Sequence, residues 1–427
     1  MRLSLTLLAA FTLLAAPRTF TPWADVKQIL NLPPDLKNAD ASKWISWSQR
    51  EDKAIRARLQ QGDLDSMVNL LLFGTSFTKQ SRIRVDGIAE AMKSGALRAR
   101  VDDLIAGLAS PNGNERLVFL SGLLRAKGID PAMPGETGVF LYNNLQRVLQ
   151  ERRALAERAK KAEATSPLDR VSLFHDRGVS LDTGIFPDYS IEQTLSDLKD
   201  RGVLREGQVA RVAVVGPGLD FADKNEESAY DYYPQQTLQP FALYDSLVRL
   251  GLARSGAVSV TIFDISSRVI DHIQRARKNP AYIVQLPRDV TRPWPPELIA
   301  YWRSLGDRVG TAVPPIQPPQ VFKGLETRAV RIRPDIVLAC EPVDLNIVLE
   351  RLNLAAADRF DLIVGTNIFL YYDAFEQSLA LENAGAMLKP GGLLLTNDQL
   401  PEVPGGSMHQ AGMTASALDT IAWYQKR

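Results

Sequence analysis

A regular alternation of strand-like and helix-like segments from about residue 166 onward is the feature that most constrains this chain. Runs rich in β-branched and aliphatic residues, "ARVAVVGPG", "AVSVTIFDIS" and "GGLLLTND", alternate with amphipathic segments such as "QPFALYDSLVRLGL" and "SRVIDHIQRARK". Alternation of this kind builds a mostly parallel sheet with helices on both faces. We therefore predict an α/β domain with a doubly wound, Rossmann-like sheet over residues 166–427.

Two parts of this domain depart from the alternation. A Pro-rich stretch at residues 279–324 surrounds one helix-like piece, "PELIAYWRSLG", and is predicted to be an inserted lid or surface arm. The next segment, "RAVRIRPDIV", is predicted to form one or two short strands. The final piece, "MHQAGMTASALDTIAWYQKR", is expected to add a last β-hairpin or strand.

The preceding part of the chain, residues 17–165, has a helical pattern. Apolar residues recur at three- and four-residue spacing in "IRARLQQGDLDSMVNLLLFG" and "VDDLIAGLA". A densely charged segment over residues 145–164 is expected to be a helix with a solvated face and internal Glu to Arg pairs, although its basic face could instead meet an acidic partner. We predict an all-helical N-terminal domain at 17–165.

Residues 1–16 resemble a secretory signal peptide, because one positive charge precedes the short apolar run "LSLTLLAAFTLLAA". The run is too short to span a bilayer comfortably, and no later stretch of about 20 apolar residues predicts a membrane span. Export to the periplasm or beyond the cell is one interpretation of this segment. A buried N-terminal helix in a cytosolic protein is the other.

The charge balance and the few metal-ligating residues exclude some functions. The 50 basic and 49 acidic side chains leave a net charge of +1, which argues against a surface that coats nucleic acid. Cys340 is the single cysteine, and the three histidines lie far apart in the sequence. Neither a cysteine-based zinc site nor a histidine pair with metal-ligand spacing is therefore expected.

Two strand ends carry the candidate ligand site. Gly216-Pro217-Gly218 ends the first strand, and its missing side chains would let a ligand approach the backbone. Asp264 ends the next strand, where a carboxylate can accept both hydroxyls of a ribose. The distance from Gly218 to Asp264 exceeds the usual spacing of about 20 residues in nicotinamide-binding units. A purely conformational glycine turn and a helix-capping aspartate are the alternative interpretations.

A third region, "FDLIVGTNIFLYYDAFEQSLALENAGAMLKPGGLLLTND" at residues 360–398, resembles the later half of the class I S-adenosylmethionine-dependent methyltransferase fold. The "LKPGG" turn between a helix and a strand carries part of the resemblance. The segment "FDLIVGTNIFLYYDAFEQ" is most similar to the chemotaxis-receptor methyltransferase branch. The resemblance implies S-adenosylmethionine as the cofactor and a small-molecule or protein methyl acceptor of unknown identity.

The resemblance also implies roles for individual residues. Gly216 and Gly218 would lie under the methionine and ribose, and Asp264 would bind the ribose. The other cofactor positions implied are Asp344 at the adenine amine, Asp220 near the amino-acid end, and Thr366 and Asn367 beside the cofactor and the acceptor atom. The chain departs from the family at Val214, where an acidic residue is usual, and at Asp220, where a third glycine is frequent.

Candidate substrate contacts lie on two loops. Tyr371, Tyr372 and Asp373 follow the "DLIVG" strand, and Tyr233 and Gln236 lie on the loop after the glycine turn. Flat aromatic contact combined with hydrogen bonding suits a pocket lining. Aromatic residues that close a hydrophobic layer are the alternative interpretation. No catalytic residue is assigned, although Asp373, Asn367 and the loop tyrosines are candidates for a base.

Methyl transfer mainly requires that donor and acceptor be held in line and that water be excluded. The sequence therefore favours an S-adenosylmethionine-dependent methyltransferase. An exported, non-catalytic binding protein on the same scaffold and a nucleotide-dependent oxidoreductase are the alternatives, since a fold does not fix a function. The expected cofactor indicates the cytoplasm, whereas residues 1–16 indicate export.

Overall fold

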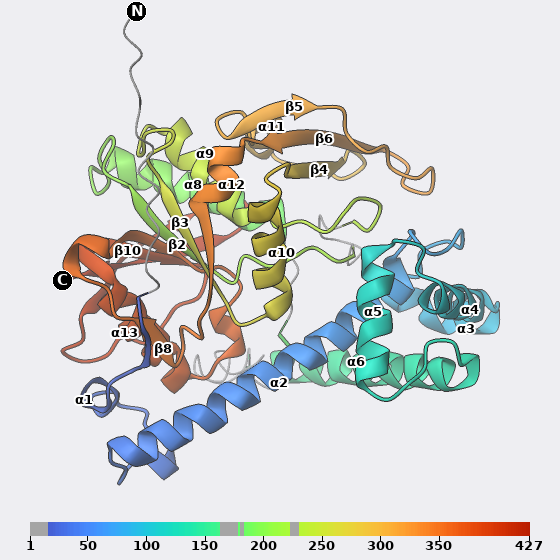
Figure 1. The fold of residues 1–427 in the computed structure, drawn as a ribbon, viewed down its shortest axis with the longest axis horizontal. Coiled ribbons are helices and arrows are strands. Elements are labelled where there is room, and N and C mark those ends of the chain that lie inside the picture. Colours follow the sequence, from blue (N-terminus) through green and yellow to red (C-terminus); the bar gives the residue numbers. More distant parts are fainter. Residues whose placement is uncertain (1–15, 163–177, 180–182, 223–229) are drawn as a thin grey trace, which may run out of the picture.

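The computed structural model describes residues 16–162, 178–179, 183–222 and 230–427. Residues 1–15, which make up most of the predicted export segment, lie outside the described residues. A seven-stranded sheet forms the centre of the molecule, with the strand order β11-β12-β10-β9-β2-β3-β7 (Figure 1). The strands are β2 (Arg211–Val215), β3 (Ser259–Asp264), β7 (Cys340–Asp344), β9 (Phe360–Val364), β10 (Leu388–Thr396), β11 (Met408–Ala415) and β12 (Thr420–Lys426).

The connections make this sheet doubly wound. Strands β7, β3, β2, β9 and β10 pair in parallel, while β12 is antiparallel to both β10 and β11. From β2 the chain moves outward to β3 and β7, and it then returns to the other side of β2 to form β9 and β10. The order therefore reverses between β2 and β9. The predicted mostly parallel sheet is confirmed, and its last two strands form the expected β-hairpin.

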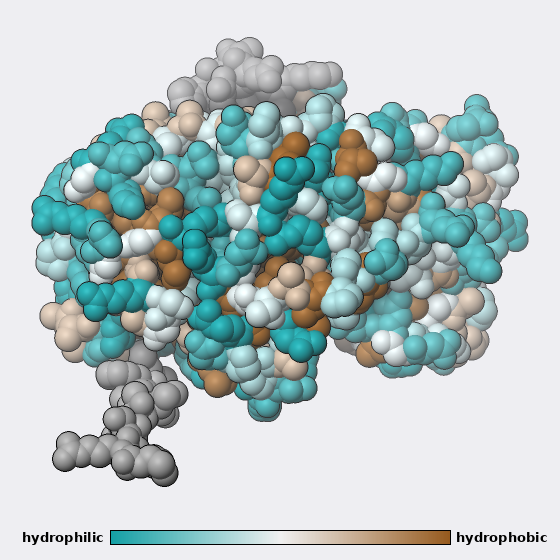
Figure 2. All heavy atoms as spheres, turned by 90° about the horizontal axis from the view of Figure 1, so that it is seen from above, coloured by the Kyte–Doolittle hydropathy of each residue, from teal (hydrophilic) through white to brown (hydrophobic). Residues whose placement is uncertain are grey.

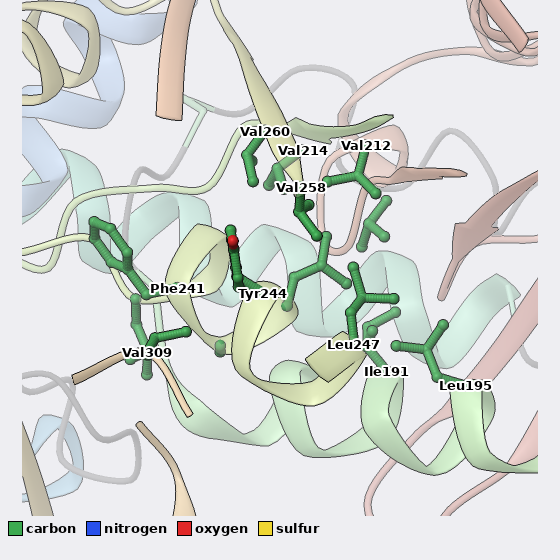
Figure 3. Packing of buried hydrophobic residues seen from close by; sticks show 14 of the residues in the cluster. Ile191, Leu195, Val212, Val214, Phe241, Tyr244, Leu247, Val258, Val260 and Val309 are labelled. Carbon is green, nitrogen blue, oxygen red and sulfur yellow. The ribbon is translucent and has the colours of Figure 1, made fainter. Parts of the chain in front are cut away.

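Helices cover both faces of the sheet because successive strand residues point to opposite sides. On one face, Val212 and Val214 pack with α8 and α9 in the first core (Figure 3). On the other face, Ala213 and Val215 pack with α13 in the second core. The helices of this domain are α8 (Ile185–Asp200), α9 (Gln239–Arg249), α10 (Ser267–Lys278), α12 (Pro334–Ala339) and α13 (Ala374–Met387).

The first part of the chain belongs to the sheet domain. Strand β1 (Arg18–Phe20) pairs antiparallel with β8 (Glu350–Leu352). After the short helix α1 (Trp23–Val26), helix α2 (Ala41–Phe73) begins against the sheet, and its Trp44 and Ile55 are buried in the second core. The Trp44 indole also donates a hydrogen bond to the Thr21 carbonyl, 2.6 Å away.

The second half of α2 leaves the sheet and joins a helical bundle at one end of the molecule (Figure 1). The bundle contains α3 (Ile88–Lys93), α4 (Ala96–Ala109), α5 (Glu115–Ala126) and α6 (Pro134–Ala162), which share the third core. The prediction of a separate all-helical domain at 17–165 is therefore not confirmed. Helical periodicity over residues 55–74 predicted the second half of α2 but could not show that the first half of the same helix packs in the core of the sheet domain.

The Pro-rich region forms a small folded unit between α10 and α12. Its strands are β4 (Ile283–Asp289), β5 (Gly310–Val313) and β6 (Leu325–Ile332), in the antiparallel order β4-β6-β5, with α11 (Pro296–Ser304) between β4 and β5. Leu298, Trp302 and Val330 bury the unit in the first core. In place of a second strand in "RAVRIRPDIV", α12 begins at Pro334, because proline fits the first turn of a helix.

The surface seen in Figure 2 carries small hydrophobic areas that are separated by hydrophilic residues. Among the described helices, none combines the length and the apolar character needed to cross a membrane.

Candidate functional site

A cavity of about 450 Å³ lies at the carboxyl ends of the parallel strands. The lining residues that follow the strands are Gly216–Gly218 after β2, Asp264 and Ile265 at β3, Leu345–Ile347 after β7, and Thr366–Ile368 after β9. The cavity thus lies over the reversal of strand order between β2 and β9, which is where doubly wound sheets bind ligands. Its volume suits a small molecule.

The glycine turn forms the floor of the cavity. Gly216 and Gly218 have φ angles of +58° and +74°, a region that L-residues with side chains rarely adopt. A Cβ atom on Gly216 would also overlap the Cδ1 atom of Ile368. The turn is therefore required by both backbone conformation and close packing, and it leaves bare backbone at the cavity.

Asp264 supplies a carboxylate oxygen without a partner. The residue is only 6% exposed and lines the cavity. Oδ1 accepts a hydrogen bond of 2.7 Å from the Ser266 amide, whereas Oδ2 is buried and has no hydrogen-bond partner in the structure. Burial raises the pKa of this carboxyl to about 7. Ser266, and not Asp264, is the N-cap residue of α10. A buried oxygen of this kind is costly unless a ligand donates to it.

The residues after β9 and the first residue of α9 add further polar groups to the cavity lining. Gln239, the first residue of α9, donates a 2.8 Å hydrogen bond from Nε2 to Thr366 Oγ1, and both side chains are buried. Because Thr366 Oγ1 accepts this bond, its own hydrogen remains available as a donor. Asn367 has a φ angle of +58°, in the left-handed region that asparagine adopts more readily than most residues other than glycine. Sequence reasoning missed Gln239, which only the fold brings to Thr366.

Helix α2, which is far from the sheet strands in the sequence, forms part of the cavity wall. Leu59 of α2 lines the cavity together with Val179, Phe186 and Pro187. One turn before Leu59, Arg56 donates from Nη1 to the Ile265 carbonyl (3.1 Å) and from Nη2 to Asp344 Oδ1 (2.8 Å). Arg56 thereby ties α2 to the carboxyl ends of β3 and β7. No local sequence signal connects α2 with these strands.

Asp344 lies beside the cavity but does not line it. It is opposite Asp264 in the pairing of β7 with β3. Its side chain is 50% exposed and forms ion pairs with Arg56 at 2.8 Å and Arg18 at 3.6 Å. The residues next to it, Leu345–Ile347, line the cavity in its place.

Asp220, Tyr233 and Gln236 hold the loop after the glycine turn and also lie outside the cavity lining. Asp220 Oδ1 accepts from the Gln236 amide at 2.9 Å, and it lies 3.7 Å from Nη2 of the buried Arg116. Arg116 also donates to the Tyr233 carbonyl at 2.7 Å. Gln236 exchanges two hydrogen bonds with the backbone of Gln285. The structure thus uses these residues to fix the loop against α5 and β4.

The three residues predicted after the "DLIVG" strand separate into two groups. Tyr371 and Tyr372 line the cavity. Asp373 is the N-cap of α13 and forms a capping box with Glu376, in which each side chain accepts from the other residue's backbone amide. This arrangement stabilises the start of the helix.

The charge of the lining is one-sided. Among the described residues that line the cavity, the ionisable acids are Asp264 and Asp419, and no Lys, Arg or His is present. The remaining lining is apolar or neutral, with Phe263, Ile265 and Ile347 near Asp264. Such a site suits a ligand that carries positive charge and hydroxyl donors, and it disfavours phosphate groups.

The fold and this site define a doubly wound α/β protein with a ligand cavity at the reversal of strand order. No protein-family model and no curated protein sequence matches the chain. Solved structures similar to it include magnesium protoporphyrin IX methyltransferase from Synechocystis PCC 6803 with bound SAM, at 12% identity over 56% of this chain and 80% of that chain, with a TM-score of 0.26.

Two further similar structures are also methyltransferases. The mitomycin 7-O-methyltransferase MmcR is 13% identical over 91% of this chain and 98% of that chain, with a TM-score of 0.30. The glycopeptide N-methyltransferase MtfA in complex with SAM is 11% identical over 58% of this chain and 96% of that chain, with a TM-score of 0.26.

Proposed function

We propose that the chain is a methyltransferase that uses S-adenosylmethionine. The observation that carries this proposal is the buried, unpartnered Oδ2 of Asp264 in the same cavity as the glycine turn. A carboxylate at the end of the second strand of a doubly wound sheet is placed to accept hydroxyl groups from a ribose. Gly216 and Gly218 leave the adjoining backbone open for the remainder of the cofactor.

The cavity fits this cofactor better than a dinucleotide. Residues 216–222 form no helix, and α9, whose first residue Gln239 lines the cavity, does not follow the glycine turn directly in the sequence. The described lining also offers no basic side chain to a phosphate. S-adenosylmethionine has a sulfonium and an ammonium group and no phosphate, which suits the two acids of the lining. These features favour a methyltransferase over a nucleotide-dependent oxidoreductase.

The cofactor, when bound, supplies a methyl group on a positively charged sulfur. The chain's own residues hold it and keep water away. Asp264 would accept from the ribose hydroxyls, and Phe263, Ile265 and Ile347 would cover the adenosine with apolar surface. Gln239 and Thr366 would offer an oxygen acceptor and a hydroxyl donor at the opposite wall. Leu59 of α2 would close the cavity from the side of the N-terminal region.

The finer family branch and the cellular location are further proposals from the sequence. The amino-acid sequence of residues 360–378 favours the chemotaxis-receptor branch, and the apolar run in residues 1–16 favours export. Ala16 and Pro17 are already part of the fold, because Ala16 packs against the second core and the Pro17 carbonyl accepts from the Asn353 amide at 3.0 Å. N-terminal sequencing of the natural protein tests whether the preceding residues are removed.

Isothermal titration calorimetry with S-adenosylmethionine, S-adenosylhomocysteine and NAD tests the function. We expect the first two ligands to bind and NAD not to bind. Asp264→Asn keeps the Oδ1 contact with Ser266 but loses the charge, and it should weaken both affinities about ten- to a hundredfold, as expected for one hydrogen bond to a charged group. The exposed carboxylate of Asp271 on α10 provides the matched control Asp271→Asn. Tight NAD binding, or unchanged affinities in Asp264→Asn, would contradict the proposal.

A further inference from the structure

A second polar cluster lies at the edge of the sheet on the side of β9, β10 and β12, away from β3, which carries Asp264. It consists of Asn367 after β9, Asn397 after β10 and Asp419 before β12. Asn397 Nδ2 donates both to Asn367 Oδ1 at 2.7 Å and to Asp419 Oδ2 at 2.9 Å, and Asn397 Oδ1 accepts from the Asn367 amide at 2.8 Å. Asn367 and Asp419 both line the cavity. One amide side chain therefore fixes a carboxylate at the cavity wall.

The turn that carries Asp419 is held in place by several further contacts. Oδ1 of Asp419 accepts from the Thr420 amide at 2.8 Å, and the Asp419 amide donates to Ser416 Oγ at 3.0 Å. Ser416 Oγ is also 2.8 Å from Ser190 Oγ on α8. The hairpin turn is thus attached to a helix of the sheet domain. Each carboxylate oxygen retains capacity for another hydrogen bond, since each can accept two.

The positions of the two carboxylates along the sheet edge separate two parts of the cavity. In strand order, Asp264 belongs to β3, the glycine turn to β2, Asn367 to β9 and Asp419 to the start of β12. Four strand spacings, about 19 Å, separate β3 from β12. A cofactor held at β3 and β2 therefore leaves the region over β9, β10 and β12 for a second molecule.

The apolar lining of this cavity indicates what kind of second molecule fits. Phe186, Leu370, Tyr371 and Leu418 line the same cavity, and Leu418 is 40% exposed at its edge. The described lining contains no cation that would pair with a phosphate or carboxylate group. An acceptor with an apolar body and an uncharged nucleophile suits these side chains, whereas an anionic acceptor would meet the Asp419 carboxylate.

We propose that Asp419 is the general base of the acceptor site and that the acceptor is a small apolar molecule with a hydroxyl or uncharged amine nucleophile. This inference rests on the proposed function. The acceptor oxygen or nitrogen forms a bond to the methyl carbon while the carbon–sulfur bond breaks and its electron pair stays on sulfur. The proton of the nucleophile passes to the Asp419 carboxylate. Asn397 is a positioning residue that keeps Asp419 directed into the cavity.

Sinefungin offers a test that does not require the natural acceptor. In sinefungin a carbon with an ammonium group replaces the sulfur with its methyl group, so positive charge lies where the methyl group would be transferred. The measurement is the ratio of sinefungin affinity to S-adenosylhomocysteine affinity. Asp419→Asn should lower this ratio about tenfold, as expected for a charge pair within about 10 Å at an effective dielectric constant of about 20.

Three comparisons make the result specific. Asp264→Asn should weaken both ligands equally and leave the ratio unchanged. Glu402→Gln, which removes a carboxylate that accepts from Gln410 on the same hairpin, should also leave it unchanged. Asp419→Ser serves as a second charge removal if Asp419→Asn does not fold, because Ser retains an acceptor in the turn.

Each outcome decides a different point. If the wild type binds neither ligand, the proposed function fails together with this inference. If it binds both and the ratio is unchanged in the Asp419 variants, the inference fails and the proposed function stands. With S-adenosylhomocysteine bound, saturation-transfer NMR should detect 4-methylphenol and not 4-hydroxybenzoate. Preference for the benzoate, or binding of neither compound, would overturn the acceptor class.

Discussion

Asp264→Asn should make the ligand-free protein more stable and its ligand binding weaker. In the folded protein, burial raises the pKa of Asp264 from the usual value near 3.8 to about 7. The native state therefore holds a proton between about pH 4 and pH 7 that the unfolded chain has released. Stability that this group contributes is lost as the pH rises through that window. Since each pKa unit is worth about 1.4 kcal/mol, the ionised carboxylate costs about 4 kcal/mol above pH 7.

The comparison is between the wild type and Asp264→Asn at several pH values, because the amide side chain of the variant does not titrate. Between pH 5 and pH 8, the free energy of unfolding of the variant should rise by about 3 kcal/mol relative to that of the wild type, as measured by urea denaturation. Over the same range, S-adenosylhomocysteine affinity should rise for the wild type, because the ionised form accepts the ribose hydroxyls, and stay flat for the variant. Asp271→Asn, which alters an exposed carboxylate, should change neither property.

Two results would show that Asp264 does not have this role. A variant that is less stable than the wild type at pH 8 would mean that the Asp264 carboxylate is stabilised by partners and not left unsatisfied. An affinity that does not change with pH in the wild type would mean that the ionised form of Asp264 does not contact the ligand.

Three further substitutions test other parts of the structure. Gly216→Ala should lower the free energy of unfolding by about 1–2 kcal/mol because of the positive φ, and it should also weaken S-adenosylhomocysteine binding by displacing Ile368. Gly391→Ala, at a residue with φ +75° and open space around it, should lower stability without changing binding. Urea denaturation measures the first effect and calorimetry the second. Arg116→Met should cost about 3–5 kcal/mol in urea denaturation because it removes the guanidinium beside the buried Asp220 carboxylate, while the exposed Arg98→Met should cost under about 1 kcal/mol. Trp44→Ala should lower the free energy of unfolding by about 3–5 kcal/mol and destabilise the whole sheet domain. Faster hydrogen exchange at β2 and β9 would show this wider effect. Exchange changes confined to α2 would contradict a shared core.

The sequence predicted those parts of the site that depend on strand ends. Gly216, Gly218, Asp264, Thr366 and Asn367 come together because parallel strands place their carboxyl ends at one edge of the sheet. The proximity of these residues thus follows from the strand pattern and does not depend on side-chain packing.

Long-range packing accounts for what the sequence did not predict. Leu59 lines the cavity, and Arg56 binds the carboxyl ends of β3 and β7, only because α2 packs against these strand ends, and nothing near them in the sequence indicates this. Asp344 occupies the expected strand end, but ion pairs with Arg56 and Arg18 hold its side chain at the surface. The polar pattern of a loop likewise does not show that Gln236 serves a backbone contact with Gln285.

A crystal structure of the protein with S-adenosylhomocysteine tests whether Asp264 and the glycine turn bind the cofactor. We expect the ribose hydroxyls to lie within hydrogen-bond distance of Asp264 Oδ2 and the homocysteine to pass over the Gly216–Gly218 turn. Adenosine bound away from Asp264, or a cavity that stays free of ligand at saturating concentration, would contradict this expectation.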